Sequence, residues 1–307
     1  MEDYPKTMLE FKKRFETEQS CQEYLYQMRW PEGFICPHCH HRQFWMMNRG
    51  QSQQYRCKSC RFWISATAGT IFQDTHIPLQ VWFGAIWQMV SQKHGISALG
   101  LQQVLGLSKY RTAWTMLHKL RVAMVRPGRD QLIGPVQVDE TYIGGPRHGK
   151  RGRGALNKTL VVVAVEDKGN HLGRIRLHKV KDASGESLIT AVKESVQSKS
   201  EVRTDDWNGY NKLSASGYEH TIIRKTADVG ENLLPLANRV ISLLKRWLQG
   251  THQGAPRSSH LGYYLDEFVF RFNRRTSRSR GLLFYRLIQQ AVNIDPVTAK
   301  DIRGGKC

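Results

Sequence analysis

Cys36-Pro-His-Cys39 and Cys57-Lys-Ser-Cys60 form two C-x-x-C pairs with 17 residues between them. This spacing is typical of a tetrahedral zinc site, in which two short turns each supply two thiolates to one ion. The segments Phe44-Trp-Met-Met47 and Gln54-Tyr-Arg56 predict two short strands that carry one turn back to the other. We therefore expect a zinc ribbon over residues 30–68, with a structural Zn²⁺ bound by Cys36, Cys39, Cys57 and Cys60. The alternative is a pair of redox-active or disulfide-forming motifs, which a basic chain without a recognisable signal peptide disfavours.

The composition of the chain is strongly basic. Its 307 residues contain 46 Lys and Arg against 26 Asp and Glu, which gives a formal net charge of +20. Such an excess favours a polyanionic partner, although a solvated basic surface would give the same count. No run of 18 apolar residues is present, so we expect no membrane span and a cytoplasmic protein. Cys21 and Cys307 lie outside the paired motifs, and we assign them no role.

Helical periodicity surrounds the predicted ribbon. Apolar residues at helical spacing predict a helical segment over residues 1–29 and a helix over residues 79–92. The residues that follow predict a helix, a turn at Gly106 and a second helix with Ser108 as its N-cap. This pattern fits a helix-turn-helix within a helical DNA-binding region over residues 69–126, although two ordinary packed helices would give the same pattern. The basic face of the second helix would then consist of Lys109, Arg111, His118, Lys119 and Arg121.

From residue 127 onward the pattern changes from helical to extended. We expect strands over residues 135–143, 159–166, 172–180, 201–205 and 220–224, and helices over residues 184–196, 236–248 and 262–271. The order is three strands, a helix, a strand, a short helix, a strand and a helix. This order predicts an α/β, ribonuclease-H-like catalytic domain over residues 127–290, in which helices flank a mixed sheet, and a C-terminal tail over residues 291–307.

Two aspartates follow strand-like segments of this domain. We place Asp139 at the end of the first strand, in Val-Gln-Val-Asp, and Asp205 after the fourth, in Val-Arg-Thr-Asp. A carboxylate beside buried strand residues is costly unless it binds a partner, and two carboxylates held close together need a cation. Because oxygen ligands favour Mg²⁺ or Mn²⁺, we predict that this pair binds a catalytic metal ion. Asp206 is an alternative to Asp205, whereas Glu140 should point to the opposite face from Asp139. Otherwise both aspartates are turn residues at the surface.

The helix after the fifth strand, residues 236–248, should approach this metal site. It contains no acidic residue, but Asn238 lies near its start and Lys245 lies seven residues on, two turns along the same face. An asparagine carbonyl oxygen can bind a hard cation without adding charge. The alternative is that Asn238 caps the helix.

Taken together, these segments resemble the transposases of the IS1595 insertion-sequence family, which have an ISXO2-like catalytic domain. The resemblance covers about residues 15–284 and rests on the ribbon, the basic helical middle and the segments VDETYIGG, TDDWNGY, LLKRWLQGTHQG and YLDEFVFRFNRR. It implies a ribonuclease-H-like core with a divalent-metal site. The first and second aspartates of the family match Asp139 and Asp205. The family usually has Glu as its third residue and Lys seven positions later. Here these positions hold Asn238 and Lys245, and related subgroups also have Asn or His in place of the Glu.

The resemblance implies a DNA transposase that cleaves and transfers DNA strands, with the ribbon zinc in a structural role only. Its partners would be the double-stranded terminal inverted repeats of its element and a target DNA, bound by a homo-oligomer that associates with the nucleoid. The alternatives are a zinc-ribbon DNA-binding protein with a decayed catalytic site and a ribonuclease-H-like nuclease that cuts without joining. The residues expected to contact DNA are Lys109, Arg111, Lys119, Arg147, Lys150, Arg151, Arg153, Arg274 and Arg275, unless these are solvated charges.

Overall fold

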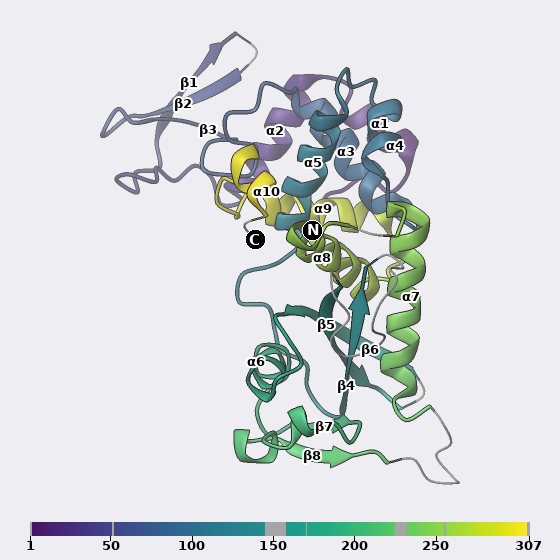
Figure 1. Ribbon diagram of the computed structural model, residues 1–307. Coiled ribbons are helices and arrows are strands. Elements are labelled where there is room, and N and C mark those ends of the chain that lie inside the picture. The colour runs from purple at the N-terminus through teal and green to yellow at the C-terminus, as the bar shows by residue number, and fades with distance from the viewer. Residues whose placement is uncertain are drawn as a thin grey trace. The chain divides into compact units, whose positions relative to one another are not determined.

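The computed structural model describes residues 2–50, 52–144, 158–169, 171–224, 232–254 and 256–305. It divides the chain into two compact units (Figure 1). The first consists of Met1–Arg126 together with Ser277–Lys306, and the second of Pro127–Thr276. The second unit ends at Thr276, whereas the sequence led us to expect a catalytic domain that continues to residue 290. Within the described ranges, no helix is both long and apolar enough to cross a bilayer.

Four helices of the first unit share an aromatic core. They are α1 (Met8–Arg14), α2 (Glu18–Arg29), α3 (Leu79–Ser91) and α9 (Arg280–Ala291). The buried Phe284 of α9 lies 5.3 Å from Phe11, 5.5 Å from Phe15 and 5.6 Å from Phe83, measured between ring centroids. These contacts attach the C-terminal segment to the N-terminal helices. They explain why residues 277–305 belong to the first unit, although the sequence predicted the end of the catalytic domain and a tail there.

The ribbon is a three-stranded antiparallel sheet in the order β1-β2-β3, formed by Phe44–Arg49, Ser52–Cys57 and Trp63–Ser65. The first two strands were predicted, and the three-residue β3 was not. One face of this sheet is packed: Tyr55 of β2 is 2% exposed and lies among Tyr26, Trp30, Phe34 and Phe44. The inner side of the ribbon is therefore held by aromatic packing as well as by its cysteines.

Two further helices, α4 (Ala98–Val104) and α5 (Tyr110–Ala123), are joined by a turn in which Gly106 has a φ of +62°. This confirms the predicted helix, turn and helix. However, α5 begins after Lys109 instead of after Ser108, and no side chain caps it. His118 and Arg121 are buried and Lys119 is half-buried, so the predicted basic face is reduced to Lys109 and Arg111. A short helix, α10 (Ala299–Gly304), ends the described chain of this unit.

The second unit contains a five-stranded mixed sheet in the order β6-β5-β4-β7-β8. Strands β4 (Val136–Ile143), β5 (Thr159–Asp167) and β6 (Leu172–Val180) are antiparallel to one another. Strands β7 (Glu201–Thr204) and β8 (Glu219–Ile222) continue the sheet in parallel to β4. The helices are α6 (Gly185–Ser195), α7 (Pro235–His252) and α8 (Leu261–Asn273), with short 3-10 turns at Asn208–Tyr210, Ser214–Ser216 and Ser258–His260.

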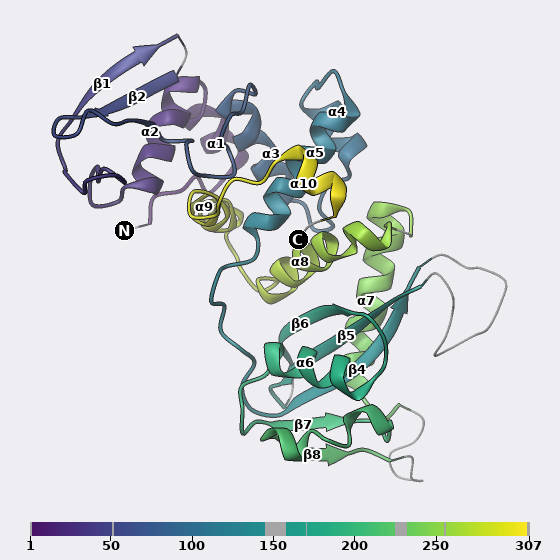
Figure 2. The ribbon, with the colours of Figure 1, turned by 60° about the vertical axis from the view of Figure 1, so that its left-hand side comes forward.

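Helices cover both faces of this sheet, with α6 on one side and α7 and α8 on the other (Figures 1 and 2). The interior strand β5 explains the arrangement, because its unbroken apolar run supplies both cores. Val161, Val163 and Val165 pack against α7 and α8, whereas Val162 and Ala164 pack on the α6 side. The sequence therefore predicted a strand buried on both faces, and this strand lies beside the middle strand β4.

Candidate functional site

Asp139 lies within β4, not at the strand's end as the sequence predicted, because β4 continues to Ile143. Its parallel neighbour β7 stops earlier, at Thr204. The two strands pair Val136 with Val202 and Gln137 with Arg203. If this register is extended by two residues, Asp139 lies level with Asp205. Extended in this way, the register sets Asp139, within β4, beside Asp205, the first residue after β7.

The two faces of β4 separate its acidic residues. Val136 and Val138 pack in the core on the α6 side, and Ile143 packs in the core with α7. Side chains alternate along a strand, so Asp139 lies on the α7 face and Glu140 on the α6 face. The hydroxyl of Tyr210, which belongs to the α6-side core, donates a 2.9 Å hydrogen bond to Glu140 Oε2. The expectation that Glu140 points away from Asp139 is therefore confirmed.

Tyr210 lies within the electrostatic influence of the carboxylates of this site. The sequence alone assigned it no role. The pKa of this fully buried phenol is raised well above its usual range, first by burial and then by the charges of Glu140, Asp139 and Asp205. All three carboxylates therefore act on one side chain. Tyr210 lies in the TDDWNGY segment, but nothing in the sequence indicates that its side chain turns toward Glu140.

Asp205 and Asp206 have different surroundings. Asp205 is partly buried, follows the fully buried Thr204, and accepts a 3.2 Å hydrogen bond from the backbone N–H of Trp207. Asp206 is exposed and forms an ion pair with Arg224 at 3.0 Å. The structure therefore favours Asp205 over Asp206 as the partner of Asp139.

Helix α7 is anchored to β4 by a side chain that the sequence analysis missed. Gln137 Oε1 accepts hydrogen bonds from the backbone N–H groups of Leu236, at 3.0 Å, and Ala237, at 3.3 Å. Gln137 lies two residues before Asp139 and therefore on the same face of the strand. The N-terminus of α7 is thus fixed beside the aspartate by a residue that satisfies two of its unpaired donors.

Asn238 does not cap α7, because the N-cap position is Leu234 and Asn238 is the fourth residue of the helix. The capping alternative is therefore wrong. Its Nδ2 donates a 2.8 Å hydrogen bond to Asn232 Oδ1, and the side chain is exposed. Lys245 is exposed; partial desolvation and the nearby Lys158 lower its pKa, whereas the charge of Asp139 opposes that shift. The structure thus places Lys245 within the electrostatic reach of Asp139.

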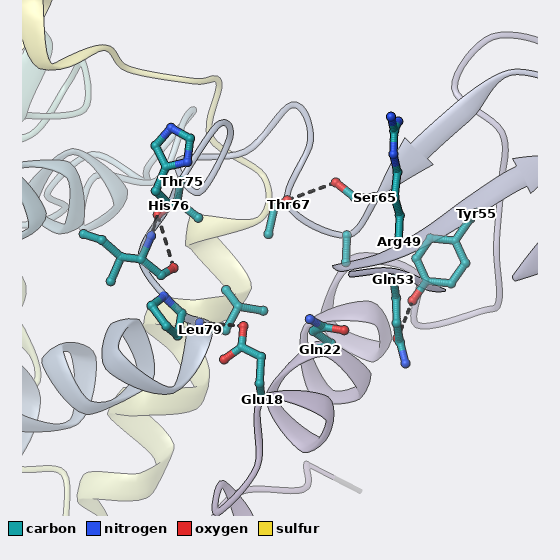
Figure 3. Close-up of a pocket in the computed structure, with 13 residues that line it drawn as sticks. Glu18, Gln22, Arg49, Gln53, Tyr55, Ser65, Thr67, Thr75, His76 and Leu79 are labelled. Atoms are coloured by element: carbon teal, nitrogen blue, oxygen red, sulfur yellow. Dashed lines mark hydrogen bonds between the residues drawn. The ribbon is translucent and has the colours of Figure 1, made fainter. Parts of the chain in front are cut away.

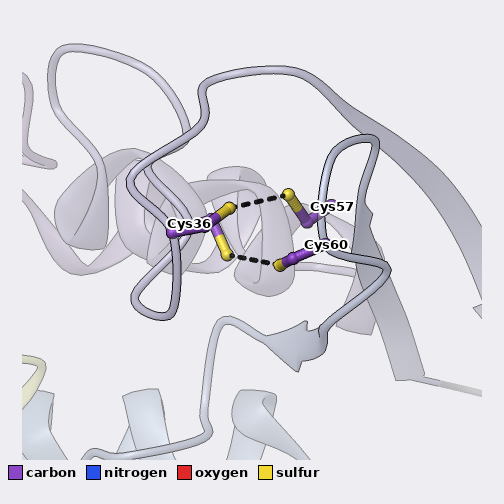
Figure 4. Close-up of side chains that lie close together, drawn as sticks. Cys36, Cys57 and Cys60 are labelled. Carbon is purple, nitrogen blue, oxygen red and sulfur yellow. Dashed lines mark hydrogen bonds between the residues drawn. The ribbon is translucent and has the colours of Figure 1, made fainter.

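The four ribbon cysteines form a compact ligand set (Figure 4). Their sulfurs all lie within 4.8 Å of one another, with Cys36 and Cys60 separated by 3.6 Å and Cys39 and Cys57 by 3.5 Å. A tetrahedral ion with Zn–S bonds of about 2.3 Å requires sulfurs about 3.8 Å apart, so the set fits zinc. The backbone N–H of His41 and the sulfur of Cys60 lower the pKa of Cys39 to about 6, which favours the thiolate that binds a metal.

The two cysteine turns have the same backbone form. The N–H of His40 donates to the carbonyl of Cys36 at 2.9 Å, and the N–H of Arg61 donates to the carbonyl of Cys57 at 3.1 Å. Both donor residues have a positive φ, 57° for His40 and 63° for Arg61. Each C-x-x-C pair is therefore closed by a strained residue four positions after its first cysteine.

The remaining predicted DNA contacts divide into three groups. Lys109 and Arg111 are exposed and line a cavity of about 590 Å³ with Lys119 and Arg303, while the ammonium of Lys119 donates to the carbonyl of Ile71 at 3.1 Å. Arg147, Lys150, Arg151 and Arg153 lie outside the described residues. The third group, Arg274 and Arg275, is at the end of α8.

Arg274 and Arg275 make contacts within the second unit that explain their presence without DNA. The guanidinium of Arg274 lies 4.0 Å from the ring centroid of Phe270, and that of Arg275 lies 4.2 Å from Phe272. Arg275 also donates to the carbonyls of Leu172 and Gly173 and thereby ties α8 to β6. A structural role therefore accounts for Arg275 best.

A second cavity of the first unit, of about 260 Å³, lies between α2, the ribbon and the start of α3 (Figure 3). The carboxylate of Glu18 accepts hydrogen bonds from the N–H groups of Leu79, at 2.8 Å, and Gln80, at 3.0 Å. This long-range contact caps α3, whose own N-cap residue Pro78 supplies no side-chain bond. Glu18 therefore has a structural role, which is to stabilise the N-terminus of α3.

Comparisons with known proteins agree with this organisation. Residues 131–273 match the family described as ISXO2-like transposase domain, and residues 16–62 match the transposase zinc-ribbon domain of the same IS1595 group. A relative in Halobacterium salinarum, described as an uncharacterized protein in transposable element ISH50, is 26% identical over 280 residues, or 84% of this chain and 92% of the relative. The chain therefore belongs to the IS1595 family of insertion-sequence transposases, as its sequence motifs indicated.

Among solved structures, a simian T-cell lymphotropic virus intasome in complex with PP2A regulatory subunit B56 gamma matches with 15% identity and a TM-score of 0.33. The match covers 65% of this chain and 74% of that one. A similarity of this size does not establish a shared fold.

Proposed function

We propose that the chain binds the ends of its insertion element and catalyses metal-dependent DNA strand cleavage and transfer. The observation that carries the proposal is the parallel pairing of β4 with β7, because extending its register by two residues would bring Asp205, which follows β7, level with Asp139. Both aspartates act on Tyr210, and Asp139 also acts on Lys245 of α7. Membership of a transposase family supports phosphodiester chemistry at this position.

The residues at this place fit a hard divalent cation. Asp139 and Asp205 offer carboxylate oxygens, and Asn238 offers a neutral amide oxygen near the start of α7. Burial is the main cause of the raised pKa of Tyr210, but Glu140, Asp139 and Asp205 add to it, and a cation would offset the charge of these carboxylates. When bound, Mg²⁺ or Mn²⁺ supplies activation of the attacking hydroxyl and stabilisation of the leaving oxygen. Lys245, beside Asp139, is suited to hold a phosphate of the DNA at the site.

The fold of the second unit supports the same proposal. Its order of three antiparallel strands, a helix, two parallel strands and a helix is the one that the sequence predicted for a ribonuclease-H-like domain. We infer that fold, with Gln137 fixing α7 beside the carboxylates. The family assignment and the zinc-type cysteine set support a structural Zn²⁺ in the ribbon, which leaves catalysis to the second unit.

Duplex DNA is the proposed partner, both as the terminal inverted repeats and as the target, with the protein acting as a homo-oligomer on them. The net charge of +20 and the exposed Lys109 and Arg111 at the start of α5 favour binding to the phosphate backbone. We propose that the α4–α5 helix pair makes this contact in the way that a helix-turn-helix binds DNA.

The experiment that tests the proposal incubates the full chain with duplexes that carry the element's ends and a target plasmid, with and without Mg²⁺. We expect cleavage at the ends and joined products, both dependent on the metal. Cleavage without joining would instead indicate a nuclease. Specific binding without cleavage in Mg²⁺ or Mn²⁺ would indicate a DNA-binding protein whose catalytic site has decayed.

A further inference from the structure

The outer face of the zinc ribbon carries a row of two exposed tryptophans with the half-buried Arg56 between them. Trp45 of β1 pairs with Arg56 of β2, and Arg56 pairs with Trp63 of β3. Residues opposite each other on neighbouring strands share a face of the sheet, so these three side chains form one row across the ribbon. Trp45 is 39% exposed and Trp63 is 44% exposed, on the face opposite the buried Tyr55.

Cations surround the two indole rings. The guanidinium carbon of Arg61 lies 4.5 Å from the centroid of Trp45, and Lys58 Nζ lies 5.8 Å from the same centroid. The guanidinium carbon of Arg56 lies 5.3 Å from the centroid of Trp63. We call these five residues the ribbon face: Trp45, Arg56, Lys58, Arg61 and Trp63. Among the described residues none supplies an acidic partner to its three cations.

Ribbon stability alone does not account for this face. The opposite face of the sheet is already packed by aromatic side chains, and the cysteine set fixes the two turns. Exposed cation–π contacts are worth only about 0.5–1 kcal/mol each. Two large exposed indoles among unneutralised cations are instead the combination that stacks nucleobases and neutralises their phosphates.

We propose that the ribbon face binds unpaired nucleotides of a DNA strand, with bases stacked on Trp45 and Trp63 and phosphates held by Arg56, Lys58 and Arg61. Trp45 and Trp63 are separated by two strand spacings, roughly 10 Å, with Arg56 between them, so one strand can contact both rings in succession. Duplex bases are stacked on each other and do not offer their faces, so the rings select unpaired nucleotides. This inference deepens the proposed function and rests on it in one respect, namely that the chain acts on DNA.

Electrostatic repulsion argues against a second copy of the chain as the partner that binds the ribbon face. A symmetric contact between two ribbon faces would bring six cations together without an acidic residue of the face to offset them. A polyanionic strand removes that repulsion and releases its own counterions when it binds.

The test compares short fluorescein-labelled single strands with blunt duplexes of the same sequence, measured by fluorescence anisotropy without added Mg²⁺. The proteins are the full chain and its Trp45→Ala and Trp63→Ala variants. We expect each variant to lose about tenfold in affinity for the single strand, and both to keep duplex affinity within about twofold. Trp45→Phe should lose less than Trp45→Ala because a ring remains. Met46→Ala is the matched control: it removes an exposed apolar side chain that pairs with Tyr55 on the other face of β1, and it should change neither affinity.

Zinc content and sedimentation complete the test. Retention of one zinc per chain shows that a variant has a folded ribbon, and variants that lose zinc are replaced by their Phe counterparts. Unchanged single-strand affinity, an equal loss on both DNAs, or a shift in oligomeric state without a loss of single-strand binding would overturn the inference. If the wild-type chain cleaves element ends but shows no dependence on the tryptophans, only this inference fails. If it binds single strands through them but cleaves no DNA, only the proposed catalytic function fails.

Discussion

At the scale of single residues, Asn238 is the residue that we propose in place of the usual acid of the family. The structure shows that Asn238 is not a cap and that its amide nitrogen bonds Asn232. We expect Asn238→Ala to raise the Mg²⁺ concentration needed for half-maximal cleavage by roughly tenfold, because a metal ligand is lost. Asn238→Glu should lower it by restoring a charged ligand. Asn232→Ala is the control, since it removes only the hydrogen bond. An equal effect of Asn232→Ala on the metal titration would show that Asn238 acts through that bond.

Lys245 provides the second prediction at this scale. It lies within reach of the charge of Asp139 on the α7 face, so Lys245→Ala should remove one phosphate contact. We expect weaker DNA binding and a decrease of about 1 in the slope of log affinity against log salt concentration. Lys193→Ala, which removes an exposed lysine of α6, should leave the slope unchanged. A salt titration in which both variants behave alike would refute a specific contact by Lys245.

At the scale of elements, the pair of strands β5 and β6 depends on a buried acid at its turn. Glu166 is 1% exposed, bonds Arg174 at 2.7 Å and accepts the N–H groups of Ile133 and Arg174. Burial raises its pKa, but the hydrogen bonds and charge of Arg174 and the two backbone donors outweigh it, so the net pKa is below the usual value. Gly173 leaves room for this acid, because a Cβ there would lie 2.6 Å from the Cβ of Glu166.

We therefore expect Glu166→Gln to lower the free energy of unfolding of the second unit by about 1–3 kcal/mol at pH 7. Because the pKa is lower in the folded state, the stabilisation by Glu166 is present above pH 4.5, its ordinary value, and is lost as the pH falls through the folded pKa. The difference between wild type and variant should thus shrink in acid. Hydrogen exchange of β5 and β6 at pH 7 and at pH 4 measures this difference in the free energy of unfolding. Glu219→Gln, at an exposed position of β8, is the control. A difference that grows in acid would contradict the assigned ion pair.

Most elements could be predicted from the sequence where burial leaves a periodic signal. The run from Thr159 to Glu166 could only be a strand buried on both faces, and the observed β5 spans Thr159–Asp167. Strand β3 was not predicted because three residues are too few to show an alternating pattern. Helix α9 was not predicted because its packing partners lie about 200 residues or more earlier in the chain. The face of α5 was misjudged because helical spacing does not reveal that Arg121 lies on the buried side.

The sequence pointed to the two aspartates of the candidate site but not to the residues that surround them. Asp139 and Asp205 follow apolar strand residues, which is a visible signal, and the β4–β7 register would bring them level if it were extended by two residues. Gln137 and Tyr210 gave no such signal. Gln137 accepts hydrogen bonds from the start of α7, about 100 residues later in the chain. The hydroxyl of Tyr210, which lies in a 3-10 turn, donates a hydrogen bond to Glu140 of β4.

At the scale of the whole molecule, the two compact units predict separable stability. Cys36→Ser should abolish zinc binding and unfold residues 30–68, while the second unit keeps its fold because its two cores contain only residues between 132 and 272. Metal analysis and peptide-resolved hydrogen exchange measure both effects. Cys21→Ser is the control, because burial raises the pKa of this thiol to about 12 and it lies outside the ligand set. Absence of zinc from the purified wild-type chain, or loss of protection in β4 and β5 of Cys36→Ser, would contradict this prediction.

The central claim is that Asp139 and Asp205 together hold the metal ion that cleaves DNA. The most direct measurement is Mg²⁺-dependent cleavage of the element's ends by wild type, Asp139→Asn, Asp205→Asn and Asp206→Asn, with end binding recorded for each. Asp206 is the matched control, because it adjoins Asp205 but is exposed and paired with Arg224. We predict a loss of at least about 100-fold for Asp139→Asn and Asp205→Asn, near-normal cleavage by Asp206→Asn, and unchanged end binding by all three. Cleavage by Asp139→Asn or Asp205→Asn within a few-fold of wild type, or an equal loss in Asp206→Asn, would contradict the claim.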